Sequence, residues 1–392
     1  MNEKTELNSS LQNNNSENIF DNKQFLWETS TGERVFRQDK SVIVELPSGR
    51  STLTTSHLNG GYREDIQYVF NHQGVDGFED CGSKLKAAGS ISTYEANVAE
   101  RIGLDPSKST GQHTAANMNN VVIVTKTFRD LEVTAVTTGG IEVNGGRAGD
   151  PASYYQENGM YNMVLGTINT ILIIGADLPS NSMVRAVVTA TEAKTVAIQQ
   201  LMGRSKYSEG IATGSGTDSI AIVANRNSSM HLTDAGKHSK LGELIGKCVI
   251  EAVQKALAKE TGLTPQSQCD MLIRLERFGI DEKKYWEVSA AMDGENRKVQ
   301  FINSLRCMAK NPALVAATAS VLHIVDEISW GLVPEKAGKK AAFETMKGLP
   351  EVLMAKNFPP FDKILNEKES IITNWIRTTA WIAKNGMYGE TE

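Results

Sequence analysis

Runs of β-branched residues that end in glycine-rich polar loops constrain the fold of this chain more than any other feature of its sequence. Three such loops lie between residues 55 and 219: TSHLNGGYRED from Thr55, TTGGIEVNGGRAGDP from Thr137 and IATGSGTDS from Ile211. β-branched residues favour strands, and a glycine lets its backbone N–H approach a ligand where a side chain would block it. One loop of this kind is typical of a turn, whereas three loops in one sheet domain can converge on a binding site.

The strand-forming runs predict two hairpins and two further strands. In the first hairpin, SVIVEL from Ser41 and STLTTSHL from Ser51 are separated by the turn sequence PSGR. In the second, NVVIVTKTF from Asn120 meets LEVTAVTT from Leu131 across an Arg-Asp bend. The apolar run that begins at Met163 and the run DSIAIVAN at residues 218–225 predict the other strands.

Amphipathic segments predict helices that cover the sheet. Residues 241–258 carry apolar side chains at helical steps, and residues 182–202 do so after Ser182, which we expect to be the N-cap. The segment ISTYEANVAERIGL from Ile91 predicts a shorter helix. The expected fold class is therefore α+β, with a layered, mixed and largely antiparallel sheet packed by helices.

The character of the sequence changes at both ends of this sheet region. Residues 1–24 are polar and predict a disordered tail, and residues 25–262 hold the predicted strands and loops. Residues 263–392 carry helical segments rich in Lys and Glu, which predict a helical C-terminal extension.

Composition and charge exclude several classes of protein. The chain has 392 residues, of which 40% are hydrophobic, and a net charge of −5 with no concentrated basic patch, so we expect no nucleic-acid partner. The longest apolar stretch is interrupted by polar residues and is too short for a bilayer span, so we expect no membrane association. The four cysteines form no C-x-x-C pair, and the first residues lack the pattern of a secretory signal, which predicts a cytoplasmic location.

Known nucleotide-binding fingerprints do not fit the glycine-rich loops. GSGTDS lacks the third glycine of the dinucleotide motif and precedes a strand, whereas that motif must open a helix. NGGRAGD lacks the G-K-[ST] ending of a phosphate-binding P-loop.

Two of the segments carry the residue types that a hydrolase needs. TGSGTDS offers the hydroxyls of Ser215 and Thr217 beside Asp218, with glycine N–H groups for an oxyanion. DAGKHSKLGE places His238 just before the helix at 241–258, where the helix dipole disfavours the charged imidazole and favours a neutral base. Glu243 follows in the first turn of that helix.

Structural interpretations of the same residues remain open. Glycine pairs between strands are most often hairpin turns, and a histidine at a helix start can simply be solvated. Asp218 can equally hold a neighbouring turn, and Glu243 can be an ordinary first-turn acid. His57, His113 and His231 lack the i, i+3 or i, i+4 spacing of a helical metal site, which leaves open a metal bound by ligands from separate loops.

Six segments, read together, resemble the adenosylcobinamide amidohydrolase family. In chain order they are TSHLNGG, GQHTAANMNN, VTAVTTGGIEVNGGRAGDP, TEAKTVAIQQL, ATGSGTDSIAIVA and GKHSKLGELIGKCVIEAV. The resemblance runs over about residues 42–258 of the 392 and rests on the order of several separated segments. It implies that residues 25–262 are a catalytic domain of this kind. The C-terminal extension lies outside the resemblance, which leaves open whether it covers the substrate, mediates oligomerisation or is a fused module with a separate role.

The resemblance implies an activity and a partner. Members of the family hydrolyse the amide that links the aminopropanol arm to the corrin ring of adenosylcobinamide, which yields adenosylcobyric acid for cobalamin salvage. We therefore expect adenosylcobinamide or a related corrinoid as the partner, and no cofactor, since the corrinoid is the substrate. A metal requirement stays open, as does a homo-oligomeric state. The alternatives are a corrinoid-binding carrier without catalysis and a hydrolase of another small amide.

We assign roles to the candidate site residues on this basis. Thr217 or a water molecule is the expected nucleophile, His238 the proton shuttle and Asp218 the residue that orients His238. The backbone amides of Gly139, Gly140 and Gly216, with Asn144, are expected to supply oxyanion and substrate contacts, and Arg147 and Asp150 to grip the rim of the ring. The remaining expected substrate-binding residues are Asn59, Gly60, Gly61, His113 and Glu243.

Overall fold

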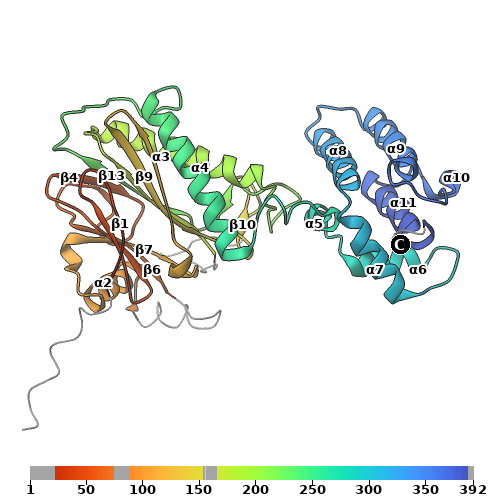
Figure 1. The fold of residues 1–392 in the computed structure, drawn as a ribbon, viewed down its shortest axis with the longest axis horizontal. Coiled ribbons are helices and arrows are strands. Elements are labelled where there is room, and N and C mark those ends of the chain that lie inside the picture. The colour runs from red at the N-terminus through yellow and green to blue at the C-terminus, as the bar shows by residue number, and fades with distance from the viewer. Residues whose placement is uncertain (1–22, 75–87, 153–154, 156–165, 387–392) are drawn as a thin grey trace, which may run out of the picture. The chain divides into compact units, whose positions relative to one another are not determined.

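Two β-sheets lie face to face in the first of the two units into which the chain divides, Met1–Leu263 and Thr264–Glu392 (Figure 1). The structure is a computed structural model that describes residues 23–74, 88–152, 155 and 166–386. The first sheet has the strand order β1-β2-β3-β6-β7, and the second has the order β5-β4-β13-β11-β9-β8. The strands are β1 (Gln24–Glu28), β2 (Arg34–Gln38), β3 (Ser41–Glu45), β4 (Arg50–Thr54), β5 (Gly61–Arg63), β6 (Tyr68–Gln73), β7 (Ser109–Thr114), β8 (Val122–Phe128), β9 (Leu131–Gly139), β11 (Ile168–Ile174) and β13 (Ser219–Asn225). A separate two-stranded ribbon joins β10 (Gly145–Gly146) to β12 (Gly214–Ser215).

The two-residue periodicity of the strands builds a four-layer domain. In β11, Ile171 and Ile173 contribute to the core between the two sheets, whereas Leu172 and Ile174 pack toward α3 (Ser180–Gln200) and α4 (Lys240–Thr261). On the first sheet, Ile43 faces the opposite way and packs with α2 (Ile91–Arg101). The layers are therefore α2, the first sheet, the second sheet, and α3 with α4 (Figure 1).

The α+β class, the mixed and largely antiparallel pairing and the helical C-terminal region predicted from the sequence are confirmed. Among the described strands, β6 with β7 and β11 with β13 pair in parallel, and the other pairs are antiparallel. Each parallel pair is connected through a helix, α2 and α3 respectively, as parallel strands require a crossover. The hairpin of β8 and β9 is also confirmed, and its bend holds Arg129 at φ 54°.

The hairpin predicted from Ser41 to Leu58 is wrong. β3 pairs with β2 and β6 in the first sheet, whereas β4 pairs with β5 and β13 in the second. The sequence PSGR is a corner that takes the chain from one sheet to the other, with Gly49 at φ +77°. Such a corner and a hairpin both reverse the chain, so they use the same turn residues.

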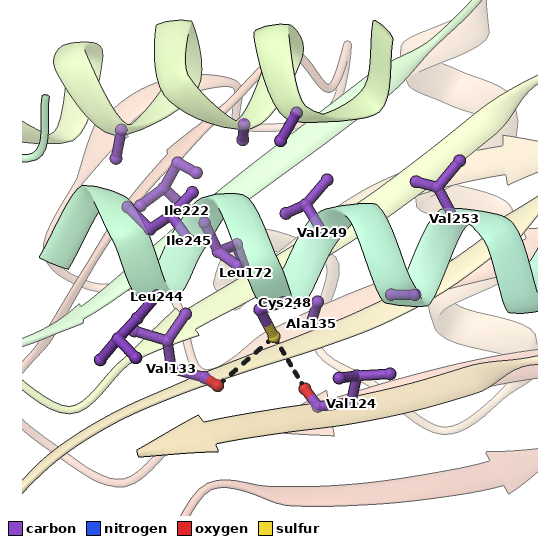
Figure 2. Packing of buried hydrophobic residues seen from close by; sticks show 14 of the residues in the cluster. Val124, Val133, Ala135, Leu172, Ile222, Leu244, Ile245, Cys248, Val249 and Val253 are labelled. Carbon is purple, nitrogen blue, oxygen red and sulfur yellow. Dashed lines mark hydrogen bonds between the residues drawn. The ribbon is translucent and has the colours of Figure 1, made fainter. Parts of the chain in front are cut away.

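Helix α4 is confirmed as the main core helix. Ser239 caps it by accepting a hydrogen bond from Gly242 N, and Gly262 ends it in the left-handed conformation. Figure 2 shows Cys248 of this helix directed at β8 and β9, where its thiol donates to Val124 O at 3.0 Å. Burial raises the pKa of this thiol to about 12, so Cys248 is a packing residue rather than a nucleophile.

Two other predicted boundaries shift. α3 begins at Ser180 after Pro179, so Ser182 is not the N-cap; it lies buried in the first turn and donates to Thr233 O at 2.6 Å. β1 begins at Gln24, inside the predicted tail, and residues 1–22 of that tail lie outside the described residues. The start of the predicted strand at Met163 also lies outside them, and β11 begins at Ile168.

The second unit is a bundle of helices with a core of its own. Trp375 and Tyr285 are fully buried in this core. One helix among the described residues, α8 (Pro312–Ser329), is long and apolar enough to cross a membrane by length and composition, with a mean hydropathy of 1.2, which is weak evidence on its own. The helices are α5 (Met271–Leu275), α6 (Glu282–Ala290), α7 (Lys298–Ala309), α8 (Pro312–Ser329), α9 (Glu335–Val352), α10 (Phe361–Ile364) and α11 (Ile371–Asn385).

A buried ion pair ties the β1–β2 turn to the second sheet. The Glu33 side chain is 0% exposed and that of Arg50 4%, and Arg50 Nε donates to the Glu33 carboxylate. Arg50 also donates to Asn225 Oδ1 at 2.7 Å and to Thr31 O at 2.6 Å. Burial alone would raise the pKa of Glu33, but hydrogen bonds from Thr29, Thr31 and Arg50 outweigh it and hold the pKa below its ordinary value.

Glu33→Gln is expected to lower the free energy of unfolding by about 3 kcal/mol at neutral pH, because the buried guanidinium loses its counter-charge. Since folding lowers the pKa of this carboxyl, its stabilisation is present above the ordinary value of 4.5 and is lost as the pH falls through the lowered value. Urea denaturation of both proteins between pH 7 and acid conditions should therefore show a difference that shrinks as the pH falls.

Glu45→Gln is the matched control for this prediction. The pair of Glu45 with Arg34 is partly exposed, with side chains 26% and 50% accessible, so its loss should cost less than about 1 kcal/mol. Equal effects of the two variants would show that the buried pair adds no special stability.

Candidate functional site

A cavity of about 1150 Å³ opens at one end of the two-sheet domain. It is lined by the loop after β4, by the end of β7 and the residues after it, and by residues 144–152. The loop that leads into β13, residues 213–219, one face of α3 and the first turns of α2 also contribute to the lining. The three glycine-rich loops predicted to converge therefore each contribute to one cavity.

Lys194 and Asp218 form an ion pair in one wall of this cavity. Their side chains are only 17% and 14% exposed. Asp218 Oδ1 also accepts from Ser215 Oγ at 2.7 Å and from Ile168 N at 2.9 Å, and Oδ2 accepts from Ser215 N at 3.0 Å. Because the carboxylate is held by two backbone amides, it fixes the position of the Lys194 ammonium group against the cavity.

Gly214 packs directly against this ion pair. A Cβ atom there would lie far inside van der Waals contact with Asp218 Oδ2 and 2.6 Å from Lys194 Nζ. Gly145, across the ribbon from Ser215, is similarly confined, since a Cβ would lie 2.8 Å from Ile141 O. Gly214 and Gly145 thus allow close packing of backbone and charged groups.

The predicted residues Thr217 and Asn144 meet at a single carbonyl. Thr217 Oγ1 donates to Gly166 O at 2.6 Å, and Asn144 Nδ2 donates to the same oxygen at 3.1 Å. Tyr207 OH donates to Asn144 Oδ1 at 2.8 Å, and Asn144 is 1% exposed. These contacts give Asn144 a role in shaping the loop. The Thr217 proton is held by a carbonyl rather than by a base.

The predicted pair Arg147 and Asp150 also lines the cavity, but it forms a turn. Asp150 Oδ2 accepts from Arg147 N at 2.8 Å and from Ser205 Oγ at 2.6 Å. Desolvation acts to raise the pKa of Asp150, and hydrogen bonds from Ser205, Ser208 and the Arg147 amide lower it below its ordinary value. The charged form of the Asp150 carboxyl therefore stabilises this loop.

A second acid, Glu95, is part of another wall of the cavity, beside His113. Glu95 Oε1 is 3.1 Å from His113 Nδ1, and their side chains are 2% and 20% exposed. Glu95 Oε2 accepts from Leu58 N at 2.8 Å and from Ser56 Oγ at 3.2 Å. His113 and Ser56 both line the cavity, as does His57.

Two of these residues, Glu95 and Lys194, were missed by the sequence analysis. Glu95 did carry a signal, because it lies on the buried face of α2 with Tyr94, Val98 and Ala99, where a charged side chain is unusual. Lys194 carried none, since a lysine of an amphipathic helix ordinarily faces water.

The structure does not bring His238 to Asp218. His238 is exposed in the turn before α4 and does not line the cavity, and the Asp218 carboxylate contacts Lys194, Ser215 and Ile168 instead. The expected orientation of His238 by Asp218 is therefore corrected. Glu243 is also outside the lining, and its ion pairs with Lys240 and Lys247 lower its pKa to about 2.

Of the other predicted site residues, some line the cavity and some do not. Gly216 lines the cavity with Thr217, Asn144, Arg147, Asp150 and His113. Asn59, Gly60, Gly61, Gly139 and Gly140 do not line it. Asn59 instead donates to Pro106 O and Ser109 O, both at 2.8 Å, and so anchors its loop. Within the described ranges, no group of three or more His, Cys, Asp or Glu side chains is placed to hold a metal ion.

Comparison with known proteins identifies relatives of the first unit. A family model described as adenosylcobinamide amidohydrolase matches residues 26–265. An uncharacterised protein of Methanocaldococcus jannaschii is 36% identical over 235 residues, which are 57% of this chain and 88% of the relative. A protein of Methanosarcina mazei named adenosylcobinamide amidohydrolase is 25% identical over 228 residues, which are 56% of this chain and 95% of that protein. The family match ends next to the boundary of the two units at Leu263.

Proposed function

Because the chain belongs to the adenosylcobinamide amidohydrolase family, we propose that it hydrolyses the amide between the aminopropanol arm and the corrin ring of adenosylcobinamide. The products are adenosylcobyric acid and 1-amino-2-propanol, which places the reaction in corrinoid salvage. The second unit lies outside the family match and is not needed for this proposal.

One observation carries the proposal. Of the six segments through which the sequence resembles the family, five contribute residues to the cavity described above. The sixth, which contains α4, contributes to the core instead. A cavity of about 1150 Å³ can hold the reacting arm and part of a bulky ring, since pockets for drug-sized ligands measure about 300–1,000 Å³.

The chemistry of the cavity wall suits attack on an amide carbonyl. Hydrolysis of an amide develops negative charge on the carbonyl oxygen, and the Lys194 ammonium is the group that we assign to stabilise it, with the Gly216 amide as a second donor. We assign water as the nucleophile in preference to Thr217. The reason is that the carbonyl of Gly166, which accepts the Thr217 proton, is too weak a base to remove it.

No cofactor is proposed, because the corrinoid is the substrate. A metal-activated water is the alternative nucleophile, and chelation tests it: loss of activity that added metal restores would replace the metal-free route. A cytoplasmic location and a homo-oligomeric state are carried forward as predictions from the sequence.

The deciding experiment incubates the full chain with adenosylcobinamide and measures 1-amino-2-propanol by mass spectrometry. Release of the amine together with a corrinoid carboxylate supports the proposal. Tight corrinoid binding without release would leave a carrier protein instead. Turnover of simple amides without turnover of the corrinoid would assign a different amide as substrate.

A further inference from the structure

His113 has an arrangement that the other histidines of the chain do not share. Its Nδ1 faces the buried Glu95 carboxylate, while the ring reaches the cavity from β7. The backbone of His113 is fixed as well, because Asn169 Nδ2 donates to His113 O at 3.0 Å and β7 pairs with β6 along its length. The ring of Tyr94 packs edge-on against the imidazole.

The contacts of Glu95 determine which nitrogen of His113 carries the proton. Its Oε2 already accepts from Leu58 N and Ser56 Oγ, so Oε1 is the oxygen that faces His113. Oε1 then needs a donor, so the hydrogen of a neutral His113 lies on Nδ1. This leaves the lone pair on Nε2, which has no hydrogen-bond partner among the described residues.

We propose that His113 is the general base of the hydrolysis and that Glu95 is its positioning residue; this inference rests on the proposed function. His113 Nε2 takes a proton from water as the water oxygen bonds to the amide carbon. The proton then passes to the amide nitrogen as the C–N bond breaks, and a carboxylic acid and an amine leave. Water and amide supply every atom of the products, so the step needs no further reactant.

The five other histidines lack one or both of these features. His57 lines the cavity, but no carboxylate in the described part of the chain orients it, and His72 lies between Ser41 and Arg101. His231 pairs with Asp177 at 2.8 Å, but neither residue lines the cavity. His238 is exposed before α4, and His323 belongs to the second unit.

The test compares His113→Gln and Glu95→Gln with the wild-type chain, and uses His231→Gln as the matched control. His113→Gln is expected to lower kcat by about 100-fold to 10,000-fold, with KM within about threefold. Glu95→Gln can turn its amide N–H toward Nδ1, which would move the His113 hydrogen to Nε2 and block the base. His231→Gln should retain wild-type kcat, because its carboxylate pair lies outside the cavity.

Two readouts separate a catalytic role from a structural one. ¹⁵N NMR of the wild-type chain should show the Nδ1–H tautomer of His113, and Glu95→Gln should convert it to Nε2–H. The acid limb of the wild-type kcat/KM profile should disappear in His113→Gln. The titratable groups around His113 are Glu95 and Tyr94 from α2 and His72 from β6, with His57 on the same cavity.

The outcomes distinguish this inference from the function on which it rests. If wild-type protein releases no aminopropanol, the proposed function fails and the inference fails with it. If wild-type protein is active and His113→Gln loses less than tenfold in kcat, only the inference fails. If His113 of the wild-type chain is the Nε2–H tautomer, this result alone overturns the inference, and no variant is needed.

Discussion

Asp218→Asn is expected to lower kcat for aminopropanol release by about a thousandfold, with KM within about threefold. Asp218 accepts from four donors: Lys194, the amide and hydroxyl of Ser215, and the amide of Ile168. The NH₂ group of the substituted side chain would face a donor whichever way its amide is turned. The Lys194 ammonium would also lose the charge that holds it, and with it the position from which it stabilises the oxyanion.

The control for Asp218→Asn is Asp177→Asn. Asp177 also pairs with a basic side chain, that of His231, but outside the cavity. Asp177→Asn should keep kcat within about threefold of wild type, because it changes no group that lines the site. Corrinoid binding measured by absorbance titration should remain in both variants. An Asp218→Asn protein that binds corrinoid and retains more than a tenth of the wild-type kcat would remove the Lys194–Asp218 pair from the mechanism.

The elements that depend on local pattern were predictable from the sequence. The stripe from Leu241 to Leu257 specifies α4 by its spacing alone, and the strands β8 and β9 are joined by a bend short enough for the pairing to be local. The corner at Gly49 was not predictable in the same way. Whether β4 returns to β3 or leaves for another sheet depends on its partner β13, which lies more than 160 residues later in the chain.

In the candidate site, too, the features that depend on local sequence were predictable, and those that depend on the tertiary path of the chain were not. The glycine-rich loops indicated where backbone could approach a ligand, and Asp218, Thr217, Arg147 and His113 do line one cavity. His238 was chosen for a property of its helix start, which is local, whereas its position relative to Asp218 depends on the tertiary path of the chain. Glu95 was identifiable only as an acid on an apolar helix face, and its partner His113 lies on a separate strand.

Gly214→Ala is expected to lower kcat by about 100-fold, although it adds a single methyl group and changes no charge. The added Cβ would overlap Asp218 Oδ2, and Asp218 cannot move aside without losing its hydrogen bonds from the Ser215 and Ile168 amides. The Lys194–Asp218 pair should therefore separate. Steady-state kinetics of aminopropanol release measures the effect.

Gly246→Ala is the matched control, because it is the same substitution in α4 where a Cβ would meet nothing within 4 Å. It should leave kcat unchanged and raise stability by about 0.5–1 kcal/mol through helix propensity. The double variant Gly214→Ala with Asp218→Asn gives the sharper result. If the methyl group acts by separating Lys194 from Asp218, it should cost less than about threefold once Asp218 has been replaced, since the interaction is already lost. A full additional loss of about 100-fold would show that Gly214 serves the substrate directly, through space that the Cβ would occupy, and not through the ion pair.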